Sequence, residues 1–131
     1  MVKQNYSRKR EAILKAIQST KIHPTAEWIY QQIKAQYPDL SLGTVYRNLA
    51  RFKEDGVIVS VGVVNGQERF DADITPHVHF ICKSCNAVLD LEGTFAGELD
   101  YRSIEKENNV LVDSHELTFY GKCHDCVSKR L

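Results

Sequence analysis

The sequence predicts an α+β protein built from two small domains, and three observations carry this prediction. Apolar side chains recur at helical spacing through residues 7–54, whereas residues 57–91 consist of short β-prone runs divided by turn residues. The only four cysteines form two C-x-x-C pairs, both in the C-terminal half. A chain of 131 residues is long enough for one ordinary domain or for two small ones.

Two helices are predicted at the start of the chain. Ser7 is a candidate N-cap for a helix over residues 7–19. Thr25 can cap a second helix, which Pro38 ends because proline disfavours helix in the residue before it. The apolar positions at helical spacing are Ile13, Leu14, Ala16 and Ile17 in the first helix, and Trp28, Ile29, Ile33 and Tyr37 in the second.

A third helix and a hairpin follow. Ser41 opens the helix, which runs from Leu42 to Glu54 with Val45, Leu49 and Phe52 on its apolar side, and Gly56 stops it. Residues 57–70 then form two β-prone runs around Asn65-Gly66, a strong hairpin signal. Three helices and a two-stranded hairpin are the outline of a winged helix-turn-helix domain.

Such a domain would place its third helix in the DNA major groove and its hairpin against the DNA backbone. The predicted outer face of this helix carries Thr44, Arg47, Asn48 and Arg51, which can contact bases or phosphates. Residues 1–70 hold 11 Lys/Arg and 6 Asp/Glu and residues 71–131 the reverse, so a basic half precedes an acidic half. The alternative is a solvated face on an ordinary helical bundle.

The acidic half predicts a small β-α-β module. His77–Leu91 is typical of strand, turn and strand, Gly97–Asn108 tolerates a helix, and Val110–Tyr120 is β-prone. The thin core of such a module would benefit from a bound metal or a dimer interface. The predicted division is therefore a winged-helix DNA-binding domain over residues 1–71, a hinge over 72–76, and a metal-binding dimerisation domain over 77–131.

The two C-x-x-C pairs predict a structural zinc site formed by Cys82, Cys85, Cys123 and Cys126. A closed shell of four thiolates has no position for a substrate, so its role is stability. Two free or redox-active pairs are the alternative. No segment has the 18 or more apolar residues of a membrane span, and the chain begins without a signal peptide's apolar core, so we expect a cytoplasmic protein with no membrane partner.

The histidine pair before the first cysteines predicts a second kind of metal site. His77 and His79 lie two apart and would share one face of a strand, whereas Cys82 is an odd number of residues away and would face elsewhere. Mixed nitrogen and oxygen ligands suit Fe²⁺, Mn²⁺ or Zn²⁺. The nearby carboxylates that could complete the shell are Asp71, Asp73, Asp90 and Glu92.

Several motifs in this order closely resemble the ferric-uptake-regulator (Fur) family. They are His23-Pro24-Thr25-Ala26-Glu27, Thr44-Val45-Tyr46-Arg47-Asn48-Leu49, Arg69-Phe70-Asp71, His77-x-His79-x-x-Cys82-x-x-Cys85 and Cys123-x-x-Cys126. The resemblance covers nearly the whole chain. It implies a homodimeric, metal-dependent repressor of transcription that binds double-stranded operator DNA, with DNA contacts from Thr44, Tyr46, Arg47, Asn48 and Arg51.

Within the family the chain is most similar to the peroxide-sensing branch. That resemblance implies a regulatory Fe²⁺ or Mn²⁺ site formed by His23, Asp71, His77, His79 and Asp90. Asp90 favours this branch, because iron-responsive relatives usually carry Glu there. It also implies that peroxide reacts at bound Fe²⁺ and oxidises His23 or His77, after which the domains uncouple and DNA is released.

Two features depart from the patterns of relatives. Pro76-His77-Val78-His79 stands where iron-responsive members often have His-His-Asp-His, so an accessory metal site lacks donors and His115 is predicted to be no essential ligand. Arg47 resembles the iron regulators, whereas well-known peroxide regulators carry Asn there. The alternatives within the family are therefore an iron-availability repressor and, third, a zinc or manganese regulator.

The rival from another class is a non-haem iron enzyme that uses His77, His79 and Asp90 as a facial triad. Five protein ligands would leave little room for a co-substrate and O₂, and the basic helix would have no role. A zinc deaminase fits less well, because the chain lacks both H-x-E and P-C-x-x-C. We therefore expect a regulator and not an enzyme.

Overall fold

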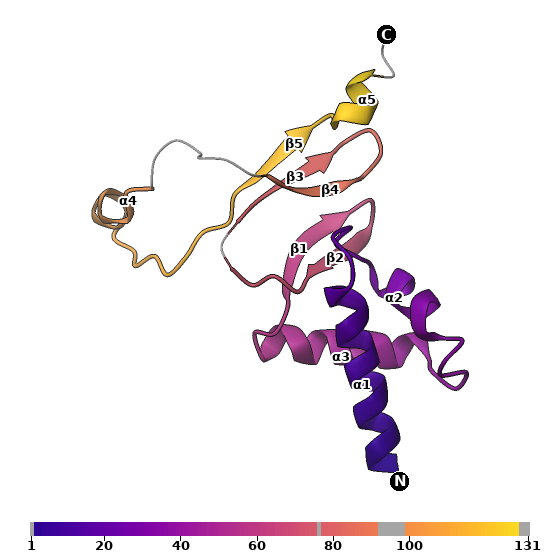
Figure 1. The fold of residues 1–131 in the computed structure, drawn as a ribbon. Helices are drawn as coiled ribbons and strands as arrows, with labels where there is room; N and C mark the ends of the chain where they lie inside the picture. Colours follow the sequence, from indigo (N-terminus) through magenta and orange to yellow (C-terminus); the bar gives the residue numbers. More distant parts are fainter. Residues whose placement is uncertain (1, 76, 92–98, 129–131) are drawn as a thin grey trace.

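The computed structural model of the protein describes residues 2–75, 77–91 and 99–128. Three helices and a hairpin come first, followed by a second small sheet with two short helices (Figure 1). The elements of the first group are α1 (Val2–Gln18), α2 (Ala26–Ile33), α3 (Leu42–Glu54), β1 (Val59–Val64) and β2 (Gln67–Asp71). Those of the second are β3 (Val78–Cys82), β4 (Val88–Leu91), α4 (Tyr101–Asn108), β5 (Thr118–Gly121) and α5 (His124–Ser128).

The strands form two separate sheets. β1 and β2 pair antiparallel, and the second sheet has the order β4-β3-β5, with β3 antiparallel to β4 and parallel to β5. In Figure 1 the β1–β2 hairpin lies between the helices and the second sheet, while α4 stands away from that sheet. The chain therefore has the predicted α+β architecture, with a three-helix and hairpin unit before a β-α-β unit.

The main hydrophobic core lies between the three helices and the hairpin. Its buried members all come from residues 13–70, and Ile13, Ile29, Val45 and Phe52 are at most 2% exposed. A second, much smaller cluster joins Val64 of the hairpin to Ile81 and Val88 of the second sheet. The second sheet is thus held to the hairpin by few apolar contacts, which leaves polar groups to define the junction.

The helix ends follow local capping chemistry where the sequence predicts it. The Thr25 and Ser41 side chains accept hydrogen bonds from the backbone N–H groups of Trp28 and Thr44, at 3.1 Å in both cases. At the end of α3, Gly56 has φ 73°. The Val57 N–H donates to the Phe52 carbonyl and the Gly56 N–H to the Lys53 carbonyl, which together make a Schellman motif.

Three predicted boundaries are wrong. α1 begins at Val2, so Ser7 lies inside it and is not its N-cap. α2 ends at Ile33 and not at Pro38, because the Gln36 and Tyr37 N–H groups both return to the Ile33 carbonyl in a terminal turn. Of the β-prone run 110–120 only its end forms β5, since the Val112 N–H bonds to the Glu105 carboxylate and not to a strand.

The hairpin and the second helical stretch agree with the sequence pattern. Asn65 and Gly66 have φ values of 52° and 79°, the positive values that a tight turn of the Asn-Gly type requires. Asp100 caps α4, which occupies the second part of the predicted stretch 97–108; residues 92–98 lie outside the described residues. None of the helices described is both long and apolar enough to cross a membrane.

We expect alanine to change the free energy of unfolding in opposite directions at Gly43, within α3, and at Gly56, just after the end of α3. A Cβ at Gly56 would meet no atom within 4 Å, so Gly56→Ala adds only the strain of a positive φ, costing about 1 kcal/mol of unfolding free energy. Gly43→Ala should instead stabilise by about 0.5–1 kcal/mol, because glycine is a poor helix former and the nearest atom is the flexible Arg47 side chain at 3.4 Å. Urea unfolding of both zinc-loaded variants checks this, and equal effects would contradict the turn assignment.

Candidate metal centres

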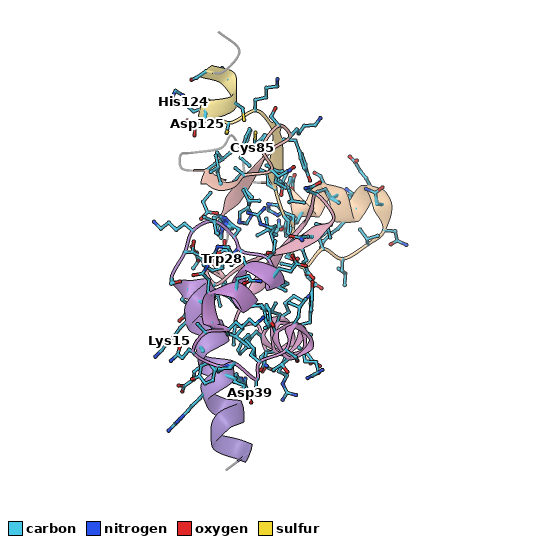
Figure 2. All side chains as sticks on the ribbon, turned by 90° about the vertical axis from the view of Figure 1, so that its right-hand side faces the viewer. Lys15, Trp28, Asp39, Cys85, His124 and Asp125 are labelled. Atoms are coloured by element: carbon cyan, nitrogen blue, oxygen red, sulfur yellow. The ribbon has the colours of Figure 1, made fainter. Side chains whose placement is uncertain are left out.

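The four cysteines meet at one end of the second sheet. Cys82 ends β3, Cys85 lies in the turn to β4, Cys123 lies just before α5 and Cys126 lies within α5. Parallel pairing of β3 with β5 sets Cys82 opposite Gly121, so the second cysteine pair follows directly beside the first. Figure 2 shows Cys85 close to His124 and Asp125 of α5, at the end of the molecule remote from α1.

The sulfur positions fit a tetrahedral metal site. All four Sγ atoms lie within 4.8 Å of one another, with Sγ–Sγ separations of 3.6 Å for Cys82–Cys126 and 3.7 Å for Cys85–Cys123. A zinc ion with Zn–S distances of about 2.3 Å requires sulfurs about 3.8 Å apart, whereas a disulfide requires about 2.05 Å. The cysteines are free of disulfides, and their arrangement fits a structural zinc site.

Backbone N–H groups stabilise the thiolate form of Cys82 in this site. The N–H groups of Cys123 and Cys85 each point to Cys82 Sγ at 3.4 Å, and together they lower the pKa of the Cys82 thiol to about 6. Hydrogen bonding of the protonated Cys126 thiol with the Cys82 and Cys123 sulfurs raises the pKa of Cys126 to about 12, and burial and repulsion by the Cys123 thiolate act in the same direction. A divalent cation would remove that repulsion, which is why four clustered thiols favour zinc over the free state.

The second cluster draws its residues from both parts of the fold. His23 lies in the loop between α1 and α2, Asp71 ends β2, His77 precedes β3, His79 lies in β3 and Asp90 in β4. Antiparallel pairing sets His79 directly opposite Asp90. One ligand atom from each of these five residues lies within 4.8 Å of the others.

The five side chains converge on a common centre. The Nε2 atoms of His23, His77 and His79 lie 2.8–3.3 Å from Asp90 Oδ1 and 2.9–3.3 Å from Asp71 Oδ2. Ligands about 2.1 Å from one ion lie about 3 Å from their neighbours and about 4.2 Å from the atom opposite. Three imidazoles and two carboxylates therefore fit the shell of a single Fe²⁺, Mn²⁺ or Zn²⁺ ion.

Hydrogen bonds outside the cluster orient its members. His77 Nδ1 lies 2.6 Å from the Thr75 carbonyl, to which it can donate a proton so that Nε2 is free to bind a metal. Burial acts to lower the pKa of His77, but the Thr75 carbonyl and the carboxylates of Asp71 and Asp90 outweigh it and raise that pKa. Sequence reasoning missed Thr75, because a backbone carbonyl leaves no signal in the residue type.

Two further features mark this centre as more than a set of surface ion pairs. His23 is 3% exposed, and its Nδ1 is buried without a hydrogen-bond partner among the described residues. Burial acts to raise the pKa of Asp71, but the Asp73 N–H, the His79 and His77 imidazoles and the nearby His23 lower it overall. The centre therefore holds an ionised carboxylate among one buried and two half-buried imidazoles, a donor set that suits a divalent cation.

The structure distinguishes among the other predicted residues. Asp73 does not join the cluster, since its carboxylate accepts from the Thr75 N–H at 3.0 Å. His115 lies apart, where its Nδ1 contacts the Tyr101 hydroxyl, and Glu92 lies outside the described residues. Cys82 turns away from the histidines, as the strand alternation predicts.

The exposed side of α3 carries most of the predicted DNA-contacting residues. Tyr46 is 50% exposed and Arg47 and Arg51 are exposed, while Thr44 is half-buried and bonds the Arg47 guanidinium at 3.1 Å. Asn48, however, is only 4% exposed, and its amide donates to the Thr44 carbonyl. Its predicted place on the outer face is wrong, because position 48 falls on the same helical stripe as Val45, Leu49 and Phe52.

A family model for the ferric uptake regulator family matches residues 2–120, and the chain belongs to this family. The peroxide-responsive repressor PerR of Staphylococcus aureus is 32% identical over 120 residues, which cover 92% of this chain and 80% of the relative. The crystal structure of the Campylobacter jejuni peroxide stress regulator is 27% identical with a TM-score of 0.71, covering 94% of this chain and 92% of that one. The ferric uptake regulator of Francisella tularensis with iron is 26% identical with a TM-score of 0.74, covering 91% of each chain.

Members of this family are transcriptional regulators, so the chain is a metal-responsive regulator related to PerR repressors and not an enzyme. The resemblance inferred from the motifs is confirmed. The fold is that of solved Fur-family structures, and the four-cysteine cluster of this chain fits a structural zinc site.

We expect Cys85→Ser to abolish stable zinc binding, because a hydroxyl replaces one of four thiolates in a closed shell. Purified wild-type protein should contain one zinc per chain by mass spectrometry of the native protein, and the variant close to none. The matched control is Ser84→Ala, which alters the adjacent position but no sulfur. Full zinc retention by Cys85→Ser would contradict the assignment of this cluster.

Proposed function

We propose that this protein is a DNA-binding transcriptional repressor whose DNA-competent shape is held by Fe²⁺ or Mn²⁺ at His23, Asp71, His77, His79 and Asp90. The observation that carries the proposal is the origin of these ligands. His23 and Asp71 belong to the three-helix and hairpin unit, while His79 and Asp90 belong to the second sheet. A cation bound by all five therefore joins the two units.

The proposed coupling follows from what these side chains do without a cation. The centre then has two carboxylates facing three imidazoles, which hold together only through protons on the Nε2 atoms. A divalent cation replaces those protons with five bonds to one point, so the angle between the units is restricted. A ligand that prefers one arrangement of two domains shifts the population toward it.

In this proposal residues 1–71 form the winged-helix domain, residues 72–76 the hinge and residues 77–131 the dimerisation domain. The exposed arginines of α3, Arg47 and Arg51, would read bases or bind phosphates of operator DNA, helped by Thr44 and Tyr46. Asn48 would act from inside the helix interface, by holding the Thr44 carbonyl. A cytoplasmic location accords with such a partner.

Dimerisation is proposed from the apolar surface of the second unit. Leu111 is 90% exposed and Tyr120 is 65% exposed, and Leu99, Val110 and Phe119 are each exposed by at least 42%. Among the described strands β5 lies at an edge of its sheet. An apolar surface of this kind favours association with a second copy of the chain. A dimer would also present two α3 helices, one for each half-site of an operator with two-fold symmetry.

We propose that peroxide is the signal that makes this repressor release DNA. Bound Fe²⁺ would supply the one chemistry that these side chains lack, the reductive cleavage of the O–O bond. His23 or His77 would then gain one oxygen atom on its imidazole while the other peroxide oxygen leaves as water. An oxidised imidazole is a poorer ligand, so the cross-unit attachment is lost and DNA is released. Asp90 and the similarity to PerR support this reading.

A second candidate is an iron-availability repressor, which Arg47 favours because this residue at the base-reading position resembles the iron regulators. Such a protein would use the same five residues but would release DNA when iron is removed, and it would not respond to low peroxide. The two candidates therefore differ in the signal and not in the site.

We expect Mn²⁺-loaded protein to bind a duplex selected from a random-sequence pool, and a chelator to release it. Arg47→Ala and Arg51→Ala should each weaken binding by about 5- to 100-fold, the usual effect of losing one base or phosphate contact. Arg102→Ala, which removes an exposed arginine of α4, should bind as the wild type does. Fluorescence anisotropy at several salt concentrations measures these affinities, and unchanged binding by both α3 variants would exclude this helix as the DNA-reading element.

We expect low peroxide to add one oxygen atom to the peptide of His23 or His77 in the Fe²⁺ form but not in the Mn²⁺ form. Peptide mass spectrometry measures the gain, with the His115 peptide as an internal control, because that residue lies outside the cluster. DNA release should rise in parallel with oxidation. Release without any modified histidine would reject the peroxide mechanism. Release on chelation, with neither release nor histidine oxidation at low peroxide, would support the iron-availability candidate.

A further inference from the structure

Arg69 makes contacts that none of the roles above explains. It lies in β2, two residues before Asp71, and therefore projects from the same face of that strand as this carboxylate. Its guanidinium donates to three main-chain carbonyls: those of His23, of Ile22 at 2.6 Å and of Asn86 at 3.1 Å. Among the described residues it forms no ion pair with a carboxylate, so its donors serve the backbone.

The three carbonyls belong to two distant segments. Ile22 and His23 lie in the loop between α1 and α2, and His23 is the one member of the proposed metal cluster that comes from this loop. Asn86 lies in the turn between β3 and β4, directly after Cys85 of the four-cysteine cluster. Arg69 therefore joins the backbone beside one metal centre to the backbone beside the other.

Both segments have unusual backbone conformations at the point of contact. His23 has φ 58° and Asn86 has φ 65°, in the left-handed region that non-glycine residues seldom adopt. The Asn86 N–H also closes its turn onto the Cys82 carbonyl at 2.9 Å. Hydrogen bonds from a charged donor to the carbonyls of such residues help to hold conformations that would otherwise relax.

We propose that Arg69 is a positioning residue that couples the two metal centres. It holds the His23 backbone in the conformation that aims the imidazole at the cluster, and it holds the Asn86 turn that carries Cys85. Zinc at the cysteines therefore favours the ligand geometry of His23, and a cation at His23 slows zinc loss from the cysteines. The coupling free energy between the two binding equilibria must be the same in both directions, because both binding events bias one shared arrangement.

The planar guanidinium of arginine suits this role better than the ammonium group of lysine. Its nitrogens point in fixed directions toward carbonyls on two sides, whereas a single ammonium at the end of a flexible chain can reach one side at a time. Loss of a residue that orients a metal ligand typically weakens metal binding by about 10- to 100-fold. Arg69→Gln should therefore weaken Mn²⁺ binding by about that factor, and Arg69→Lys should recover part of the loss.

A purely structural role would have a different signature. The hairpin also contacts the second sheet through Val64, which packs on Ile81 and Val88 in the small apolar cluster. Val64→Ala is therefore the matched control, because it weakens the same junction by another route. A general loosening would appear in both variants, whereas positioning of His23 would appear only in the arginine variants.

The test uses full-length protein with its zinc retained, in the wild-type, Arg69→Gln, Arg69→Lys, Val64→Ala and His23→Ala forms. Mn²⁺ affinity is measured by titration, and the geometry of the second site by the visible absorption of Co²⁺ added in place of Mn²⁺. Zinc loss is followed with a zinc-selective fluorescent chelator, with and without Mn²⁺. Zinc content and a cooperative thermal transition confirm folding, and Arg69→Lys provides the result should Arg69→Gln fail to fold.

The inference is supported if Arg69→Gln, like His23→Ala, binds Mn²⁺ at least about 10-fold more weakly, shows the altered Co²⁺ spectrum and loses the protection of zinc by Mn²⁺, while Arg69→Lys is impaired to a smaller degree in the same three measurements. Equal losses in Val64→Ala, or wild-type behaviour of both Arg69 variants beside a defective His23→Ala, would overturn it. The inference rests on the proposed regulatory site through His23. Wild-type Mn²⁺ affinity in His23→Ala would overturn the proposed function itself, so the two failures are distinguishable.

Discussion

The convergence of three imidazole Nε2 atoms on two carboxylate oxygens is the constraint on which the junction of this protein depends. Among the described residues, the buried apolar cluster that joins the hairpin to the second sheet consists of Val64, Ile81 and Val88, whereas the buried members of the main core all belong to residues 13–70. A junction with so little buried apolar surface is held mainly by polar groups, whose strength changes with protonation and with bound cations. This is a suitable place for a site at which a chemical signal changes the arrangement of two units.

The two metal centres differ because their ligands come from different parts of the chain. All four cysteines belong to residues 82–126, so the zinc-type centre stabilises a single small sheet. The histidine and aspartate centre needs residues from 23 to 90 and exists only when the two units meet. Thiolates held by backbone N–H groups favour a permanent soft-ligand site, whereas imidazoles and carboxylates bind a cation reversibly. Arg69 lies between the two centres, which is why the inferred coupling falls on this residue.

Much of the fold could be predicted from local chemistry. Ser41 begins α3 with a side-chain cap, and Gly56 ends it with a positive φ. Asn65-Gly66 forms the hairpin turn through two positive φ values. Prediction failed where local preference met a tertiary contact. The β-prone residues after Val110 remain outside a strand because the Glu105 carboxylate takes the Val112 N–H, and Asn48 is buried because its position on the helix outweighs its polarity.

The sequence by itself determined which atoms could bind metal, because residue type fixes ligand chemistry and C-x-x-C or H-x-H spacing fixes which ligands can share one ion. It also carried the motifs that define the family, and these cover nearly the whole chain. Residue type and proximity in sequence left Asp71 and Asp73 both open, and only the family resemblance singled out Asp71. The tertiary structure supplies the physical difference between them, since Asp71 faces the cluster and Asp73 binds Thr75. The roles of Thr75 and Arg69 were likewise invisible in the sequence, because both act through backbone carbonyls, which every residue has and which only the folded chain brings within reach.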